Sequence, residues 1–174
     1  LPAIKGLCVA YIELVRGVPL VTFLFMASVM FPLFVPQGLG VDKLLRAQMA
    51  FILVMAAYLA EVVRGGLQAI PKGQYEAAAS LGLSYWPSIV LVVLPQAMRL
   101  SIPALVNTFI GFFKDTSLVI VIGLFDLLGA AKAVIVDARW VGFGVEVYLF
   151  AGAVYFAVCF GVSQYSQRLE KEQV

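Results

Sequence analysis

Two long stretches of this sequence almost lack charge, and they restrict the fold more than any other feature. No charged residue occurs between Val18 and Val35, and the range 85–125 contains only Arg99, Lys114 and Asp115. Hydrophobic residues make up 63% of the chain and charged residues 13%, with a mean hydropathy of +1.00, so apolar side chains must face lipid or other membrane helices. Hydrocarbon leaves every backbone N–H and C=O to be paired within the protein, and these runs lack the alternation of barrel strands. We therefore expect an all-α fold, a polytopic bundle of transmembrane helices.

The composition also weakens most catalytic interpretations. The chain contains no histidine, which removes haem ligation, histidine-based zinc sites and histidine base catalysis. Cys8 and Cys159 lie far apart in apolar sequence and suit helix surfaces better than a disulfide or a metal site. The formal net charge of +2 is small and scattered, so nucleic-acid binding is not expected. We expect no catalytic residue, no metal and no cofactor in this chain.

Apolar runs of sufficient length predict four membrane spans. Hydropathy alone would divide the range 85–125 into one span or two. Pro87, Pro95 and Pro103 favour one, because three prolines in its first half suit a broken, interfacial approach to the membrane. The predicted spans, within a single domain of residues 1–174, are approximately residues 11–34, 44–63, 101–121 and 147–167.

The most polar interior segment follows the second span, at about residues 64–86, where glycines and Pro71 precede a short helix-favouring run. If this segment lies in the cytoplasm, seven basic residues lie on the cytoplasmic side of the membrane and four on the opposite side. This bias agrees with the positive-inside rule. Those inside are Lys5, Arg16, Arg64, Lys72, Arg99, Arg168 and Lys171, and those outside are Lys43, Arg46, Lys132 and Arg139. We therefore expect a cytoplasmic loop that carries its own helix.

Within this loop, Glu76-Ala77-Ala78 is followed after three residues by Gly82 and later by Leu94-Pro95. Three successive alanines leave a smooth helix surface that another protein can approach, and Gly82 lets the chain leave the helix sharply. Glu76 lies early in the helix, where its charge complements the dipole. The alternative is a passive amphipathic helix on the membrane surface. The full spacing resembles the EAA signature of the membrane subunits of ATP-binding-cassette (ABC) importers.

Other segments carry the same resemblance over almost the whole chain. This chain is similar to the polar-amino-acid branch of these permeases at residues 11–20, 60–74 and 114–118. At finer detail, residues 25–34 and 163–170 are similar to the general L-amino-acid permeases of Gram-negative bacteria. Members of that family have at least one helix upstream of the position of Leu1, so we expect this chain to lack an N-terminal part.

The resemblance implies the type I ABC importer permease fold, in a multi-pass protein of the bacterial inner membrane. It implies transport of L-amino acids into the cytoplasm by alternating access, with Glu76, Ala77, Ala78 and Gly82 coupling the chain to ATPases. The implied partners are a second permease, two ATP-binding-cassette ATPases and a periplasmic amino-acid-binding protein. ATP and Mg would belong to the ATPases, since this chain has no Gly-x-x-x-x-Gly-Lys-Ser/Thr loop. The preferred amino acids, and whether the two permeases are identical, stay open.

Lys114 and Asp115 are the first candidates for the substrate pathway. They lie among Phe112, Phe113 and Leu118, where a charged pair is costly unless it is paired, hydrated or near an interface. An amino-acid zwitterion offers one carboxylate and one ammonium, which these two side chains suit. The alternative is an internal ion pair that stabilises a break in the helix or binds the partner permease.

Further polar residues accompany this pair. The hydroxyl groups of Thr116 and Ser117 are suited to bond backbone carbonyls that such a break leaves without partners, or to hydrogen-bond the substrate. Asn107 lies close to two helical turns before Lys114, and we expect it to share that face approximately. The alternative to a place on the substrate pathway is that Asn107 hydrogen-bonds to a neighbouring helix.

Glu61 and Arg64 lie three residues apart at the end of the second span and are expected to pair on the helix surface. A plain interfacial ion pair is favoured for them over a gate.

Two rival functions are weighed against the importer. A self-contained channel or ion-coupled carrier would use Lys114 and Asp115 as a charge relay, but it needs no protruding alanine-rich helix. An intramembrane enzyme is disfavoured, because the chain lacks histidine, suitably placed paired aspartates and a metal motif.

Overall fold

The computed structural model describes residues 2–34 and 40–171, and within them every regular element is helical. The α-helices are α1 (Pro2–Arg16), α2 (Leu20–Phe25), α3 (Phe31–Phe34), α4 (Lys43–Gln68), α5 (Lys72–Ser80), α6 (Tyr85–Pro87), α7 (Leu94–Asp115), α8 (Leu127–Val136) and α9 (Gly144–Lys171). Met26–Met30 and Ser88–Val93 are π-helical, whereas Thr116–Ile122 and Ala138–Trp140 are 3₁₀. The all-α fold expected from the sequence is confirmed.

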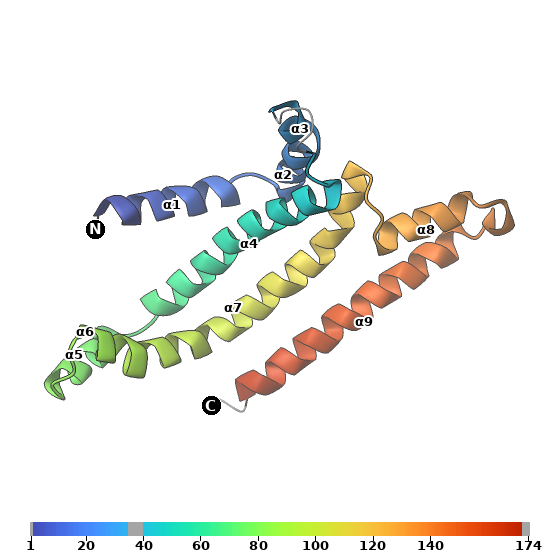
Figure 1. The fold of residues 1–174 in the computed structure, drawn as a ribbon. Helices are drawn as coiled ribbons and strands as arrows, with labels where there is room; N and C mark the ends of the chain where they lie inside the picture. The colour runs from blue at the N-terminus through green and yellow to red at the C-terminus, as the bar shows by residue number, and fades with distance from the viewer. Residues whose placement is uncertain (1, 35–39, 172–174) are drawn as a thin grey trace.

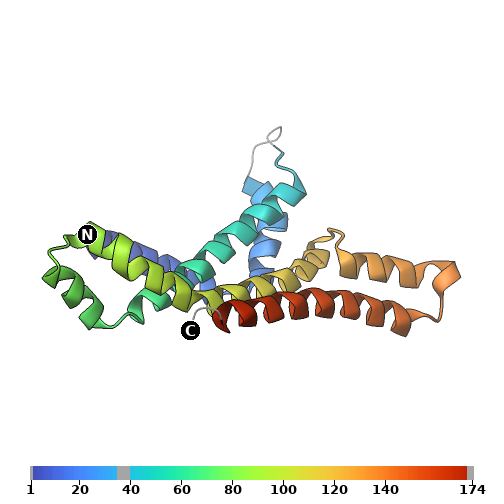
Figure 2. The ribbon, with the colours of Figure 1, turned by 90° about the horizontal axis from the view of Figure 1, so that it is seen from below.

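Three helical segments are long and apolar enough to cross a membrane, namely Lys43–Gln68, Tyr85–Ile122 and Gly144–Leu169 among the described residues. A fourth candidate is the pair Pro2–Arg16 and Leu20–Phe34, whose two halves meet at 94°. Figure 1 shows α4, α7 and α9 lying along one general axis, with α7 antiparallel to the other two and with α5 and α6 together at one end. In the orthogonal view, the start of α4 rises out of the plane of α7 and α9, and α2 and α3 stand beside it (Figure 2).

The sharp bend between α1 and α2 falls inside the range 11–34, which the sequence suggested as a single span. The α-helix ends at Arg16, and the Gly17 amide still donates to the Glu13 carbonyl, at 2.9 Å. Pro19 then has φ −60° and ψ 140°, an extended conformation from which α2 begins anew. Proline suits such a start because the first turn of a helix leaves its N–H groups unbonded. A helix elbow therefore lies within that predicted span.

The helix before residue 101 is continuous, although three prolines suggested an interfacial, broken approach. Tyr85–Ile122 forms one helical run of 38 residues, in which Pro87 lies in the first turn and Pro95 at the start of α7. Only Pro103 lies inside an α-helix. The π-helical stretch before Pro95 absorbs the local change in winding, as such segments do. The predicted crossing at 101–121 thus covers only the second part of a longer helix.

Side chains bond to backbone carbonyls where the helices depart from regular winding. The Ser88 hydroxyl donates to the Ser84 carbonyl at 2.9 Å, where the second π segment begins. Arg46 of α4 donates through Nη1 to the carbonyls of Ala27 and Ser28, at 3.3 and 2.7 Å, within the first π segment. Each bond brings a side-chain donor to a backbone carbonyl at or beside a π segment; the Ser84 carbonyl also accepts the Ser88 backbone N–H at 3.0 Å.

Small residues allow α4 and α7 to approach closely. A Cβ added at Gly66 would lie 2.0 Å from the Ser101 Oγ and 2.8 Å from the Ala97 carbonyl oxygen. Ala47, Ala50 and Ala57 are also buried on α4. Helix pairs in membranes pack in this way, because lipid offers no hydrophobic drive between helices and close backbone contact replaces it.

Two apolar clusters continue this packing to the neighbouring helices. One joins Val15 of α1, Val54 and Ala57 of α4, and Phe112 of α7. The other joins Leu24 of α2 to α4 and to Ile122. By contrast, only 6% of the most apolar part of α9 is buried. Most of the apolar surface of α9 is therefore left for lipid or for another chain.

A tight turn connects α8 to α9. The Asp137 carboxylate accepts the backbone N–H of Arg139 at 2.9 Å and pairs with the Arg139 guanidinium at 2.8 Å. These hydrogen bonds from Arg139 hold the pKa of Asp137 below its ordinary value. In Figure 1 the returning helix α9 lies alongside α8.

We predict that Gly66→Ala destabilises the protein by about 1–3 kcal/mol, because the new methyl group would collide with the Ala97 carbonyl and the Ser101 side chain. Gly65→Ala is the matched control, since its Cβ would meet nothing within 4 Å among the described residues. Thermal unfolding of the purified protein in detergent, followed by gel filtration, measures the difference. Equal melting temperatures for the two variants would contradict the close approach.

Candidate functional site

The alanine-rich loop forms the compact helix α5, with well-defined ends. Pro71 precedes it with φ −59° and ψ 141°. At its other end Gly82 has φ +75°, its N–H bonds to the Ala79 carbonyl, and the Leu83 N–H bonds to the Ala78 carbonyl, at 2.9 and 3.1 Å. This pair of bonds is the Schellman arrangement, which requires a left-handed residue that glycine adopts without a steric penalty. Gly82 thus turns the chain back toward α6 and the start of α7.

The alanines of α5 do not share one environment. Glu76 and Ala77 are exposed, whereas Ala78 is only 2% exposed and lies on the side of α5 that packs against Ser88–Val93. The sequence suggested that all three alanines form a surface for another protein. In the structure Ala78 instead lets α5 lie close to its own chain, because a larger side chain would hold the two segments apart.

A side-chain hydrogen bond joins α5 to the start of α7. The Gln96 side-chain amide donates to the Gln74 side-chain oxygen at 3.0 Å. The segment that leads into α5 is also attached, because Ile70 forms a buried apolar cluster with Val93 and Ala97. Sequence reasoning missed this attachment, because Gln74 and Gln96 lie 22 residues apart and nothing in the sequence pairs them.

Large side chains are exposed around the end of α5. The exposed fractions of Leu81, Tyr85 and Trp86 are 80%, 69% and 72%. Exposed aromatic side chains such as Tyr85 and Trp86 are typical of a membrane interface. They lie beside the exposed EAA residues in the chain, so this end of the molecule presents an apolar and aromatic surface.

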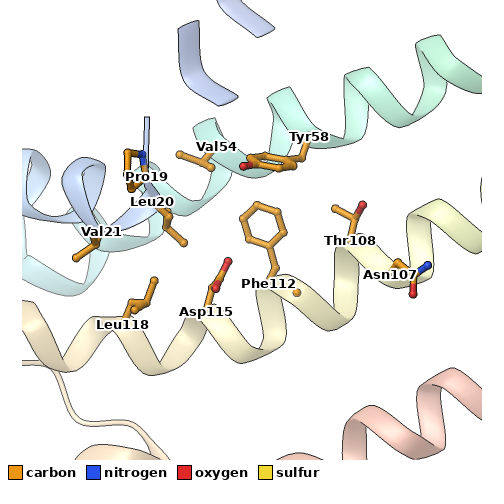
Figure 3. Close-up of a pocket in the computed structure, with 11 residues that line it drawn as sticks. Pro19, Leu20, Val21, Val54, Tyr58, Asn107, Thr108, Phe112, Asp115 and Leu118 are labelled. Carbon is orange, nitrogen blue, oxygen red and sulfur yellow. The ribbon is translucent and has the colours of Figure 1, made fainter. Parts of the chain in front are cut away.

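A cavity of about 510 Å³ lies between the elbow, α4 and α7. Figure 3 shows its lining residues, which come from Pro19 and the start of α2, from facing turns of α4 and α7, and from the 3₁₀ segment that follows α7. They are Pro19, Leu20, Val21, Val54, Tyr58, Asn107, Thr108, Gly111, Phe112, Asp115 and Leu118. Asp115 is the one ionisable carboxyl group among them, and its side chain points from α7 toward α4.

The structure places the substrate-pathway candidates on two sides of α7. Asp115 and Asn107 line the cavity, but Lys114 and Ser117 line a separate depression with Tyr148 and Tyr155 of α9. Within the described residues no ion pair joins Lys114 to Asp115. The approximate shared face expected for Asn107 and Lys114 therefore does not extend to a shared cavity.

The winding changes beside these charges, since the α-helix α7 ends at Asp115 and a 3₁₀ helix continues the same helical run. The Thr116 hydroxyl donates to the Phe113 carbonyl at 2.7 Å, and the Ser117 hydroxyl donates to the Lys114 carbonyl at 2.8 Å. Of the two roles suggested by the sequence for these hydroxyls, the structure shows bonding to backbone carbonyls.

Glu61 and Arg64 form the expected helix-surface pair, with two bonds of 2.8 and 2.7 Å to the two carboxylate oxygens. A third group joins them, because Arg16 of α1 lies 3.4 Å from the same carboxylate. The Arg16 guanidinium carbon also lies 5.5 Å from the centre of the Tyr58 ring. Nothing in the sequence pairs these two residues, since Arg16 is 45 positions from Glu61.

No cluster of three or more His, Cys, Asp or Glu side chains suited to a metal ion occurs among residues 2–34 and 40–171. The geometry offers instead an exposed helix attached to α7, and a cavity with one carboxyl group farther along the same helix. Such an arrangement is suited to binding a molecule in the cavity and to relative movement of the helices.

Comparison with known proteins shows what this chain is similar to. The family described as "Binding-protein-dependent transport system inner membrane component" matches residues 2–171. The inner membrane amino-acid ABC transporter permease protein YhdY of Escherichia coli is 58% identical over 98% of this chain and 47% of its own length. The glutamate/aspartate import permease protein GltK of Escherichia coli is 38% identical over 88% of this chain and 70% of its own.

A solved structure, described as the crystal structure of an amino acid ABC transporter with histidines, superposes with a TM-score of 0.87. The two chains are 31% identical, and the match covers 99% of this chain and 78% of the solved chain. The expected importer permease fold is thereby confirmed. The chain spans about half or less of the length of the first two relatives it matches, YhdY and the permease protein BztC of Rhodobacter capsulatus. The chain belongs to the family of binding-protein-dependent transport system inner membrane components and is a multi-pass protein of the inner membrane.

Proposed function

We propose that this chain is the transmembrane subunit of an ABC importer that moves L-amino acids into the bacterial cytoplasm by alternating access. The matched relatives are named as amino-acid ABC permeases, that is, as transport components. The chain itself catalyses no covalent step. Its role is to bind substrate within the membrane and to change shape when partner subunits move α5.

The observation that carries this proposal is the attachment of α5 to α7. Gln74 and Gln96 bond to each other, and Ala78 packs against the segment leading into α7. Asp115 lies 19 residues beyond Gln96 on the same helix, a rise of about 28 Å. A rigid helix of this length carries a displacement at α5 to the wall of the cavity, which is what mechanical coupling requires.

Asp115 is the proposed anchor for the substrate's ammonium group. It is the carboxyl group on the cavity wall, and Thr108 and Asn107 lie about two helical turns away with hydroxyl and amide groups. Lys114 lies on the α9 side, so it is not expected to bind the carboxylate of the same molecule. A second permease, packed against the open side of the cavity, would supply the remaining contacts. A homologous but different chain is the partner we propose.

The other partners follow from the same proposal. Two ATP-binding-cassette ATPases would each grip a loop like α5, with Glu76, Ala77 and the exposed side chains near Gly82 in contact. ATP and Mg would be bound by those subunits. A periplasmic amino-acid-binding protein would deliver substrate at the opposite end, near α8.

The rival carrier mechanism receives less support from the geometry. It needs Lys114 and Asp115 to exchange charge, yet the two side chains line different depressions on α7. Flux through liposomes that lack the ATPase would support the carrier and contradict the importer.

Labelling from either side of the membrane tests the orientation. In a Cys8→Ser, Cys159→Ser background, we expect Tyr75→Cys to react with an impermeant maleimide in inside-out vesicles only. Val141→Cys, in the exposed α8–α9 turn, is the matched control and should react in right-side-out vesicles. Reaction of Tyr75→Cys from the periplasmic side would remove the coupling role of α5.

Substitution at Gly82 tests the coupling itself. Gly82→Val forces a β-branched residue to φ +75°, which costs about 1–2 kcal/mol and displaces the end of α5, so ATP-driven uptake should fall about tenfold. Glu76→Ala should also lower uptake, with the ATPase still co-purifying. Gly73→Ala, at an open position inside α5, should transport normally. Normal uptake by the Gly82 and Glu76 variants would contradict the proposal.

The two charges on α7 are predicted to differ in their effect on substrate. Asp115→Asn removes a charge-assisted bond to the ammonium group and should raise the substrate concentration for half-maximal ATPase stimulation about tenfold. Lys114→Gln serves as the comparison and should change this concentration much less. The measurement uses the reconstituted complex with its binding protein. A larger effect of Lys114→Gln would reverse the assignment.

A further inference from the structure

A second groove, of about 360 Å³, lies between α4 and the helical segment 23–34. Six of its ten described lining residues are phenylalanine or methionine, three are alanine or leucine, and Arg46 is the one charged residue. Met30, Met49 and Leu53 are 44%, 53% and 52% exposed, so the groove opens onto the outer surface of the helices. Figure 2 shows α2 and α3 beside the start of α4, where this groove lies.

This groove is separate from the cavity that contains Asp115. No described residue lines both. On α4, Met49 and Leu53 line the groove. Val54 and Tyr58 line the cavity, from a face of α4 that is turned by roughly 100° about the helix axis. The groove is therefore not part of the proposed substrate site.

Arg46 brings a positive charge to the wall of the groove. Its Nη1 donates to the carbonyls of Ala27 and Ser28, but its Nε is buried without a hydrogen-bond partner. None of the ion pairs within residues 2–34 and 40–171 includes Arg46. Neutral carbonyls orient a guanidinium without neutralising it, and a cation among apolar side chains is costly without an anion. The charge of Arg46 is therefore available to an anion that enters the groove.

The charged and apolar parts of the groove lie at different depths. Along α4, Arg46 is the lining residue nearest the start of the helix, and Leu53 lies about 10 Å farther along. The 26 residues of α4 extend over about 39 Å, which exceeds a hydrocarbon thickness of about 30 Å, so the first turn reaches the headgroup region. The charge thus lies near the headgroups and the apolar walls continue toward the middle of the bilayer. A phospholipid presents its groups in the same order.

We propose that one anionic phospholipid of the bilayer binds in this groove, with its phosphate at Arg46 and part of an acyl chain against Met49 and Leu53. An uncharged helix of another subunit would cover the apolar walls but leave Arg46 without an anion. A zwitterionic lipid brings its own ammonium group, which competes with Arg46 for the phosphate. Because Arg46 also bonds to Ala27 and Ser28, the bound lipid would help to hold the π segment Met26–Met30 against α4.

Native mass spectrometry tests this site on the protein purified with its co-purifying subunits in a neutral detergent. The sample is titrated with phosphatidylglycerol, or with phosphatidylcholine that has the same acyl chains. We expect one phosphatidylglycerol for each copy of this chain, bound about fivefold more tightly than phosphatidylcholine. Arg46→Gln should remove this preference, and Arg46→Lys, which keeps the charge, should retain it. Lys43→Gln is the matched control, because Lys43 lies three residues away but approaches Gly123 and does not line the groove.

A second pair of variants tests the apolar part of the site with all charges in place. Met49→Trp should weaken the binding of both lipids, because the larger ring occupies the space of the acyl chain. Ile52→Trp is its matched control, since Ile52 is 66% exposed on α4 but lies outside the groove.

Three results would each overturn the proposal: equal binding of the two lipids by the parent, equal losses in Arg46→Gln and Lys43→Gln, or unchanged binding by Met49→Trp. A purified complex that binds no phosphatidylglycerol would mean that another subunit covers the groove, which would overturn it as well. Lipid binding needs neither ATP nor substrate. A protein that fails to import amino acids would therefore contradict the proposed function and leave the lipid result unaffected.

Discussion

The close approach of α4 and α7 at Gly66 is the contact on which the rest of the arrangement depends. It lies between α5 and the cavity, so it fixes the two helices that connect these regions. Ser101 and Ala97 fill the space that a side chain at Gly66 would take. In a bilayer, where apolar residues gain nothing by leaving lipid for protein, such complementarity holds helices together.

The second general constraint is that backbone groups in hydrocarbon need partners. The helices depart from regular winding at both π segments and at the end of α7. Ser88, Arg46, Thr116 and Ser117 each donate to a backbone carbonyl at or beside one of these places. Irregular winding inside the membrane is therefore stabilised locally, and the hydroxyl groups on α7 are engaged before any substrate arrives.

Much of this organisation could be predicted from the sequence, because it depends on local chemistry. Uncharged stretches predicted helices, the Glu76-Ala77-Ala78 spacing identified the family, and the Glu61–Arg64 spacing predicted a pair. What could not be predicted depends on angles and on distant contacts. The elbow after Arg16 and the continuous helix through Pro95 follow from how the chain resumes helical winding after a proline, which hydropathy does not report. The separation of Lys114 from Asp115 depends on which neighbours α7 receives on each side.

The π-helical stretch Ser88–Val93 has a consequence for rotational register. A π turn accommodates one residue more than an α turn, so everything that follows is rotated by about 100° about the helix axis. The direction in which Gln96 meets Gln74, and in which Asp115 enters the cavity, is therefore set by a single extra residue near the start of the helix. A change of one residue in the length of this stretch would therefore turn Gln96 and Asp115 away from their present directions, whereas an exchange of its side chains would leave the rotation unchanged.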